Sequence, residues 1–323
     1  MTRVLVTGAN GFVGRALCPA LAMAGHNVVA AVRDPGAAQD LAEGDVRAVG
    51  SIGPETDWTE ALKGVDTVVH LAARVHVMDE HARNADADFM RVNAAGTRRL
   101  AESAARAGVR RMVLMSTIKV LGDDTEAGRT FAEADSPAPE DAYGRSKLGA
   151  EKALMEIAGT TGLESVIVRP PLVYGPGVGG NMLALLRIVD RALPLPFGAI
   201  RNSRSLISVG NLVDAVIRTL ESSAAAGSTF VVRDGEDVST PRLVRMLADA
   251  LGRPARLLPV PVSLLGLVGH VTGRTAAVSR LTGSLRVDDG LIRRQLDWTP
   301  PQTVVQGIAD TAAWYAAHRD RNG

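Results

Sequence analysis

The sequence predicts the α/β class, with a doubly wound parallel sheet followed by a smaller C-terminal lobe. Short β-branched runs alternate with Ala/Leu-rich helical segments through the first 170 residues. Runs such as RVLVTG and DTVVHLAA are apolar on both faces, as strands buried between two helix layers are. After VRPPLVYGPG the composition changes, because Pro and Gly cluster at 170–180, 194–198 and 252–261.

The elements of the first half alternate along the chain, which favours a parallel sheet with helices on both faces. The expected strands are 3–7, 27–32, 46–50, 66–71, 111–116 and 164–169. The expected helices lie near 12–24, 57–63, 86–107 and 142–160. Residues 1–170 are therefore expected to form one domain.

The second half, residues 171–323, is expected to form mainly the smaller lobe, and segments near 203–233 are expected to return to the first domain. Further helices are expected at 181–193, 211–223, 240–251 and 302–317. A ligand of such a protein binds at the carboxyl ends of the strands, between the two parts.

The composition argues against several classes of protein. The 36 basic and 35 acidic residues nearly balance, so a nucleic-acid binder is not expected. The one cysteine, Cys18, leaves no intramolecular disulfide and suits a reducing compartment. The N-terminal MTRVLVTG lacks the apolar core of a signal peptide, so a cytoplasmic location is expected.

The longest apolar stretch is LPVPVSLLGLVGHV at 258–271. It holds two prolines and is shorter than the ~20 residues of a membrane span, so no span is expected. We expect a packed helix here. The alternative is a helix that rests on a membrane surface.

The segment TGANGFVG follows the first strand and opens a helix. Gly8 permits a tight turn, Gly11 lets the backbone approach a pyrophosphate, and Gly14 allows close packing of helix on strand. The free N–H groups at the start of the helix attract an anion. In this strand–turn–helix context the spacing predicts a dinucleotide site.

The second expected strand ends in VVAAVRDP. An acidic residue at its tip would bind the ribose hydroxyls of NAD, but the strand ends at Val32 and Arg33 follows. Arg33 suits a 2′-phosphate and so predicts NADP. The adjacent Asp34 leaves NAD possible, and a solvated surface arginine is the alternative interpretation.

The segment YGRSK carries Tyr143 and Lys147 four residues apart, which puts both on one face of a helix. A nearby cationic lysine is expected to lower the pKa of the phenol and to make it a better acid or base. The alternative is an exposed Tyr and Lys on an ordinary helix.

Taken together, these motifs resemble the extended short-chain dehydrogenases/reductases, the NAD-dependent epimerase/dehydratase family. TGANGFVG, HLAAR, VNAAGT, MSTIKVLG, YGRSK and RPPLVYGPG occur in the order seen in that family. RSLISVGNLVDA and LDWTP extend the resemblance over nearly the whole chain. The resemblance implies a Rossmann-type NAD(P)-binding domain and a smaller C-terminal substrate-binding lobe.

The resemblance also implies roles for individual residues. Tyr143 would be the acid/base, Lys147 would also hold the nicotinamide ribose, and Thr117 would hydrogen-bond the reacting oxygen. The residues implied for cofactor binding are Gly8, Asn10, Gly11, Phe12, Val13, Gly14, Arg33, Ser51, Ile52, Leu71, Ala72, Ala73, Asn93, Ser116, Tyr143, Lys147, Pro170 and Val173. Ser51 stands where an aspartate commonly contacts adenine.

Extended members of this family mostly act on nucleotide sugars, so a UDP-linked sugar is the expected partner. The residues implied for substrate binding are Thr117, Lys119, Tyr143, Asn181, Phe197 and Arg204; no metal ligands are expected. An N-cap role for Asn181, a core position for Phe197 and a surface position for Arg204 are the alternatives. Lys119 is interpreted as a solvated turn lysine more readily than as a ligand.

The segments AARVHVMDE, MSTIKVLG and VRDGEDVSTP resemble those of bacterial proteins of O-antigen and capsule synthesis. Among them are 4-reductases that form UDP-N-acetylquinovosamine from the UDP-4-keto-6-deoxy sugar, and UDP-sugar 4-epimerases with tightly bound NAD. Arg33 favours the reductase, and the epimerase is the alternative. Ketone reductases of flavonoid- or steroid-like molecules and non-catalytic NADP sensors are further alternatives. Helices 86–107 and 142–160 correspond to those that pair in dimers of this family, so a homodimer is expected.

Overall fold

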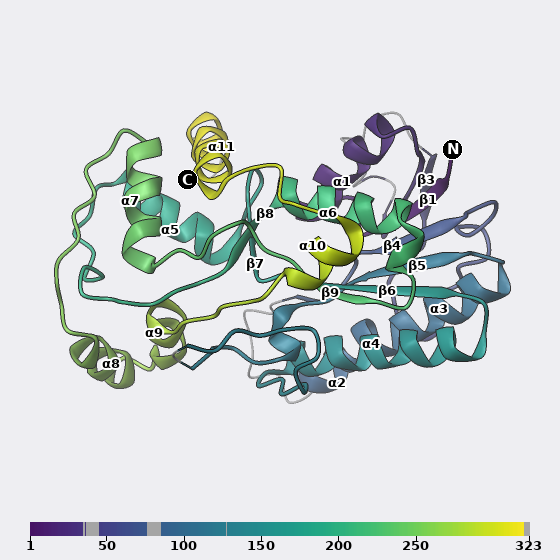
Figure 1. The fold of residues 1–323 in the computed structure, drawn as a ribbon, viewed down its shortest axis with the longest axis horizontal. Coiled ribbons are helices and arrows are strands. Elements are labelled where there is room, and N and C mark those ends of the chain that lie inside the picture. Colours follow the sequence, from purple (N-terminus) through teal and green to yellow (C-terminus); the bar gives the residue numbers. More distant parts are fainter. Residues whose placement is uncertain (35, 37–44, 76–84, 127, 320–323) are drawn as a thin grey trace.

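A seven-stranded parallel sheet forms the centre of the protein (Figure 1). The computed structural model describes residues 1–34, 36, 45–75, 85–126 and 128–319. The strand order is β3-β2-β1-β4-β5-β6-β9. The strands are β1 (Arg3–Thr7), β2 (Asn27–Val32), β3 (Asp45–Ala48), β4 (Thr67–His70), β5 (Arg111–Met115), β6 (Glu164–Arg169) and β9 (Thr229–Val231). This arrangement confirms the predicted fold class, and the first six strands fall within two residues of their expected positions.

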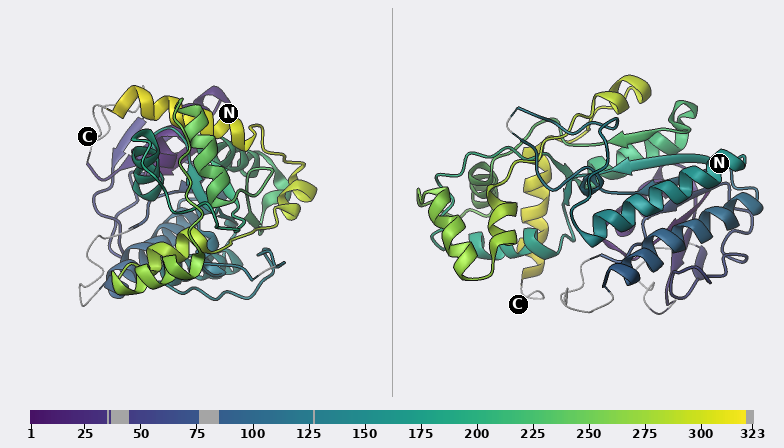
Figure 2. Two further views of the ribbon diagram at one scale, coloured as in Figure 1. Left: turned by 90° about the vertical axis from the view of Figure 1, so that its left-hand side faces the viewer. Right: turned by 90° about the horizontal axis from the view of Figure 1, so that it is seen from below.

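Helices cover both faces of the sheet (Figures 1 and 2). On one face α1 (Phe12–Met23), α6 (Val209–Glu221) and α10 (Gly290–Leu296) form one core cluster with the sheet, which includes Val4 and Val6 of β1. On the other face α3 (Gly96–Arg106) and α4 (Ala142–Thr160) enclose Leu5. Alternate side chains of one strand thus enter two separate cores, which explains why these strands are apolar on both faces.

The helix expected at 86–107 consists of α2 (Ala85–Phe89), the π-helical segment η2 (Met90–Ala95) and α3. Periodicity along the sequence did not predict the π-helical turn. It lies against α4, where Gly149 allows close approach: a Cβ on that glycine would lie 3.0 Å from Ala94 Cβ and 3.1 Å from Met90 Cε.

The C-terminal lobe contains α5 (Gly180–Asp190), α7 (Thr240–Ala250), α8 (Val262–Val271), α9 (Thr275–Thr282) and α11 (Val304–His318). Two short strands, β7 (Leu172–Tyr174) and β8 (Leu206–Ser208), form a separate parallel pair beside it. Short 3₁₀ turns occur at η3 (Ile118–Val120) and η4 (Ser223–Ala225). The chain returns to the main sheet through α6 and β9, and the segment before α6 pairs with β7 and not with that sheet.

Two sequence predictions are wrong. Residues 57–63 form turns and no helix: Asp57 accepts the backbone N–H and hydroxyl of Thr59, at 2.9 and 2.7 Å, in a local turn. The apolar stretch 258–271 does contain a helix, α8, but only one side of it packs on the protein, and its apolar side chains stay exposed: Leu264 is 49% exposed and Val271 77%. Among the described residues, no helix is long and apolar enough to cross a membrane.

Candidate functional site

The glycine turn between β1 and α1 is built for close backbone contact. Gly8 has φ +68°, and a Cβ there would lie 2.9 Å from the backbone nitrogen of Ala72. The N–H of Gly11 donates to the carbonyl of Gly8 at 2.9 Å. A Cβ on Gly14 would lie 2.3 Å from the Gly8 carbonyl oxygen, so only glycine fits. The turn therefore leaves the N-terminus of α1 uncovered by side chains at these three positions, as a pyrophosphate cradle requires.

The other cofactor residues of this region lie around the turn. Phe12 and Val13 open α1 and are partly buried, and the carbonyl of Asn10 accepts a hydrogen bond from Arg15 Nε at 3.0 Å. Ser51 is exposed, whereas Ile52 packs below α3, where a Cβ on Gly96 would lie 2.8 Å from its Cγ2. The Ser51 hydroxyl thus faces solvent.

The carboxyl end of β2 carries no carboxylate at its last position. Val32 is buried at 2% exposure, while Arg33 and Asp34 are both exposed. The Asp34 carboxylate accepts the N–H of Gly36 at 2.9 Å, so it is engaged in its own turn. Arg33 is thus the charged side chain nearest to the end of the strand in the described part of this turn.

The loop after β4 is held by a histidine that the sequence analysis did not single out. His70 lies between two hydroxyls, with Thr7 Oγ1 2.7 Å from Nδ1 and Thr97 Oγ1 3.1 Å from Nε2. Burial, helped by the charge of Lys147, lowers the pKa of His70 to about 3, so the ring is neutral. Thr7 Oγ1 also accepts the N–H of Ala72 at 3.2 Å. Leu71, Ala72 and Ala73 are thereby fixed beside Gly8.

Asn93 joins this loop to α4. Its side chain accepts the N–H of Arg74 at 2.7 Å and donates to the Arg74 carbonyl at 3.0 Å. It also donates to Ser146 Oγ at 2.9 Å, and that hydroxyl donates to the carbonyl of Tyr143 at 2.8 Å. The π-helical turn η2 carries Asn93, so irregular helix geometry coincides with a residue that supports the site.

Helix α4 carries Tyr143 and Lys147 one turn apart, as predicted. Asp141 caps the helix by accepting the N–H of Gly144 at 2.6 Å. The predicted effect on the phenol is wrong in this structure: burial and then the Asp141 charge raise the pKa of Tyr143 to about 12. Burial lowers the pKa of Lys147 to about 8 against the opposing charge of Glu151. Desolvation is the main cause of both shifts, and it leaves the phenol protonated at neutral pH.

The two hydroxyls after β5 have different surroundings. Ser116 is 3% exposed and donates to the carboxylate of Glu151. Thr117 is 9% exposed and caps η3, where its hydroxyl accepts the N–H of Lys119 at 3.3 Å. The Ser116 hydroxyl is thus committed to the protein interior, whereas Thr117 keeps its hydroxyl proton for another partner.

A buried ion pair lies behind these hydroxyls and was missed in the sequence. Arg169 donates to both oxygens of Glu151, at 2.9 and 2.7 Å, and Glu151 is fully buried. Glu151 is on α4 four residues after Lys147, so a Y-x-x-x-K-x-x-x-E spacing was the available signal. The pair connects β6 to α4, and Pro170, which follows it, accepts the N–H of Ile118 at 3.0 Å.

Lys119 is partly exposed and is held by two carboxylates. Its ammonium lies 2.5 Å from Asp141 Oδ2 and 3.1 Å from Asp123 Oδ2. Burial acts to lower the pKa of Lys119, but the two carboxylates outweigh it and the pKa lies above its ordinary value. Lys119 therefore ties the segment after β5 to the N-terminus of the catalytic helix.

The substrate-side residues come from separate segments. Val173 in β7 is partly buried, and Asn181 is exposed in the first turn of α5. Phe197 packs on the apolar core of the C-terminal lobe. Arg204 donates to the carbonyls of Arg280 and Gly283, both at 3.0 Å. Arg204 is partly buried, and burial lowers the pKa of its guanidinium even though Asp123 and Asp124 oppose that shift.

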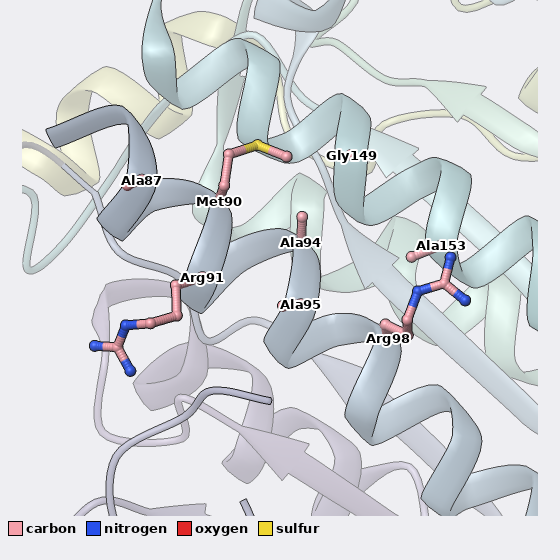
Figure 3. Close-up of a pocket in the computed structure, with 8 residues that line it drawn as sticks. All are labelled: Ala87, Met90, Arg91, Ala94, Ala95, Arg98, Gly149 and Ala153. Atoms are coloured by element: carbon pink, nitrogen blue, oxygen red, sulfur yellow. The ribbon is translucent and has the colours of Figure 1, made fainter. Parts of the chain in front are cut away.

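One hollow lies away from these residues, on the outer face of η2, α3 and α4 (Figure 3). The residues that line it are Ala87, Met90, Arg91, Ala94, Ala95, Arg98, Gly149 and Ala153. Its lining is mostly small and apolar, and it offers no acid, base or nucleophile. It is therefore not the site of chemistry.

Comparison with known proteins identifies a family for this chain. The family described as "NAD dependent epimerase/dehydratase family" matches residues 4–232. The chain belongs to this family. It is an enzyme of the extended short-chain dehydrogenase/reductase type.

Similar proteins span the whole chain. A UDP-glucose 4-epimerase of Vibrio cholerae is 43% identical over 98% of this chain and 97% of its own length. An N-acetyl-α-D-glucosaminyl-diphospho-ditrans,octacis-undecaprenol 4-epimerase of Escherichia coli O157:H7 is 28% identical over 99% and 97%. The solved structure of MoeE5 in complex with UDP-glucose and NAD is 28% identical, with a TM-score of 0.77 and coverage of 98% and 99%.

Proposed function

We propose that this protein reduces the 4-keto group of a UDP-linked 6-deoxy-hexosamine with NADPH, as in the formation of UDP-N-acetylquinovosamine. The observation that carries the choice of reductase is the end of β2, where Val32 is buried and apolar and Arg33 is exposed. A guanidinium binds a 2′-phosphate, while the carboxylate that would favour NAD is missing from the last position of the strand.

The cradle supports a nicotinamide dinucleotide. Gly8, Gly11 and Gly14 admit the pyrophosphate to the N-terminus of α1, and Leu71 to Ala73 line the other side of the turn. Lys147 is the candidate to hold the nicotinamide ribose. Pro170, whose carbonyl accepts the N–H of Ile118, and Val173 in β7 are further candidates for cofactor binding. When bound, NADPH supplies the hydride.

The chain's own residues supply the proton and the orientation. In the proposed reaction the sugar C4 carbonyl carbon gains the hydride and its oxygen gains the proton of the Tyr143 hydroxyl. The raised pKa of Tyr143, about 12, keeps that proton in place at neutral pH. Thr117 orients the carbonyl by a hydrogen bond, and Lys147 stabilises the phenolate that forms. Asn181, Phe197 and Arg204 are the candidates for the diphosphate and the base.

A UDP-sugar 4-epimerase is the second candidate. It is favoured by the 43% identity to the Vibrio cholerae UDP-glucose 4-epimerase over nearly the full length of both chains. An epimerase holds NAD through the cycle, oxidises C4 and returns the hydride to the opposite face. Tyr143 then takes a proton from the C4 hydroxyl before giving one back.

One assay separates the two. The purified protein is mixed with UDP-4-keto-6-deoxy-N-acetylglucosamine and either NADPH or NADH, and cofactor oxidation is followed by absorbance. We expect consumption of NADPH in preference to NADH. Interconversion of UDP-glucose and UDP-galactose, or of their N-acetyl forms, without added cofactor would overturn the reductase and support the epimerase.

A homodimer through η2, α3 and α4 is also proposed. Met90 is 43% exposed beside the hollow of Figure 3, and small residues around it permit close helix packing. Sedimentation equilibrium should give twice the chain mass. Met90→Glu should shift the protein toward monomer, whereas Met23→Glu, at an 83% exposed position on α1, should not.

A further inference from the structure

Helix α8 presents an apolar stripe to solvent. Leu264, Leu267, Val268 and Val271 are 49%, 59%, 52% and 77% exposed. Their spacing is i, i+3, i+4, i+7, the pattern that ordinarily faces a protein core. Soluble monomers rarely leave such a continuous apolar patch uncovered.

The stripe faces away from the rest of the lobe. Gly269, on the opposite side of the helix, is the buried position of α8 and packs on α9, where its Cβ would lie 2.7 Å from Val278 Cγ2. Figures 1 and 2 show α8 at the outer end of the C-terminal lobe, with α9 between it and the sheet domain. The exposed stripe is therefore not covered by α9, and it does not belong to the hollow at η2, α3 and α4.

The charged residues that neighbour α8 in the sequence are all basic. Residues 250–287 contain no Asp or Glu but include five arginines. Of these, Arg256 precedes α8 in the sequence and Arg274 follows it, and both are exposed. Neither forms an ion pair among the described residues. An apolar helix face with flanking cations is complementary to an anionic lipid surface, into which the apolar side chains insert while the cations meet the headgroups.

We propose that α8 docks the C-terminal lobe on an anionic membrane surface as an interfacial helix. The helix has ten residues and lies on the surface of the lobe, so it rests in the interface and does not cross it. This proposal does not depend on which sugar is the substrate or on whether the reaction is reduction or epimerisation. It gives the exposed stripe a covering that an isolated protein lacks.

The test is sedimentation of the full-length protein with vesicles of phosphatidylcholine alone and of phosphatidylcholine mixed with phosphatidylglycerol. We expect binding to the mixed vesicles and little to phosphatidylcholine. Leu264→Asp combined with Leu267→Asp should weaken binding by at least about tenfold. Val305→Asp, at a 58% exposed position on α11, is the matched control and should bind as the unaltered protein does.

A charge arm tests the lipid class. Arg256→Glu combined with Arg274→Glu should reduce binding to the mixed vesicles by about tenfold, and Arg106→Glu on α3 should not. Circular dichroism and turnover should be unchanged in all of these variants, because the altered side chains are exposed. Failure to bind mixed vesicles overturns the proposal. So does a change of oligomeric state in the α8 variant, because a second copy would then cover the stripe.

Discussion

The end of β5 and the end of β2 lie in one sheet, yet they are built differently. After β5, side chains engage one another within the protein: Ser116 with Glu151, and Lys119 with Asp141 and Asp123. After β2, Arg33 is exposed and has no ion-pair partner among the described residues. Under the proposed function, the fold thus holds the reacting groups in advance, whereas the choice of cofactor depends on a surface side chain. Substitutions at the first end should alter turnover or stability, and those at the second should alter affinity alone.

The largest effect is expected from Tyr143→Phe. Removing the hydroxyl takes away the proton donor but keeps the ring, which packs edge-on to Phe89 at 6.3 Å. Turnover should fall by about 10³-fold while the dissociation constant of NADPH stays the same. Steady-state kinetics and a fluorescence titration measure the two. Tyr315→Phe on α11 is the control, and a Tyr143→Phe enzyme with normal turnover would remove Tyr143 from the chemistry.

Glu151→Gln tests whether the buried pair holds the β5 end together. It leaves the Arg169 charge buried without its counter-charge, so the free energy of unfolding should fall by about 3 kcal/mol. Urea denaturation gives that value. Glu156→Gln, on the same helix and in an exposed pair with Arg98, should cause no measurable change. Equal midpoints for the two variants would contradict the internal organisation described for this end.

Arg33→Ala probes the β2 end. Loss of a charged contact to the 2′-phosphate should raise the KM for NADPH by about tenfold and leave the KM for NADH and the thermal stability unchanged. Arg106→Ala is the matched control. If the substitution changes the KM for NADPH and the KM for NADH equally, Arg33 does not bind the 2′-phosphate, and the proposed preference for NADP is wrong.

The buried Lys147 makes the site pH-dependent. With a pKa of about 8, it loses its charge as the pH rises through that value, so kcat/KM for reduction should decline above about pH 8. Lys147→Arg should keep the plateau to higher pH because arginine stays charged. Stability should move the other way. In the unfolded chain this lysine keeps its ordinary pKa of 10.5, so the unfolded state holds the proton at pH values where the folded state has lost it. The free energy of unfolding should therefore rise as the pH increases from about 8 to 10.5. A flat kinetic profile would contradict the role of the charge.

The sequence predicted the sheet and the helical placement of Tyr143 and Lys147 well because both depend on local patterns. Strand limits follow runs of apolar residues, and the positions of Tyr143 and Lys147 follow helical spacing. The His70 bridge joins Thr7 to a strand 63 residues away, so no local pattern contains it. The helical spacing from Tyr143 to Glu151 could have indicated Glu151, but not its partner Arg169 on β6. The pKa of Tyr143 was predicted in the wrong direction for a related reason: burial is a property of the assembled fold.

Helix α8 shows the opposite limit. Its apolar period is plain in the sequence, but a pattern gives the width of a stripe and not the direction in which it faces. In α6 a similar pattern places Leu212 and Val216 in the core, fully buried, whereas in α8 Leu267 is 59% exposed. Only the position of α9 and the Gly269 contact turn that face outward.

The smallest effect is expected from Lys119→Ala. Its ammonium is only partly buried and is held by two carboxylates, so its loss should lower the unfolding free energy by about 1 kcal/mol. The KM for the sugar nucleotide should change by less than about twofold, because the ion pairs already occupy the charge. Lys63→Ala, which removes an exposed pair with Glu60, is the comparison for stability. A large rise in KM with unchanged stability would instead mean that Lys119 leaves its carboxylates to bind substrate. The end of β5 would then resemble the end of β2, because each would use an exposed charge to bind a ligand.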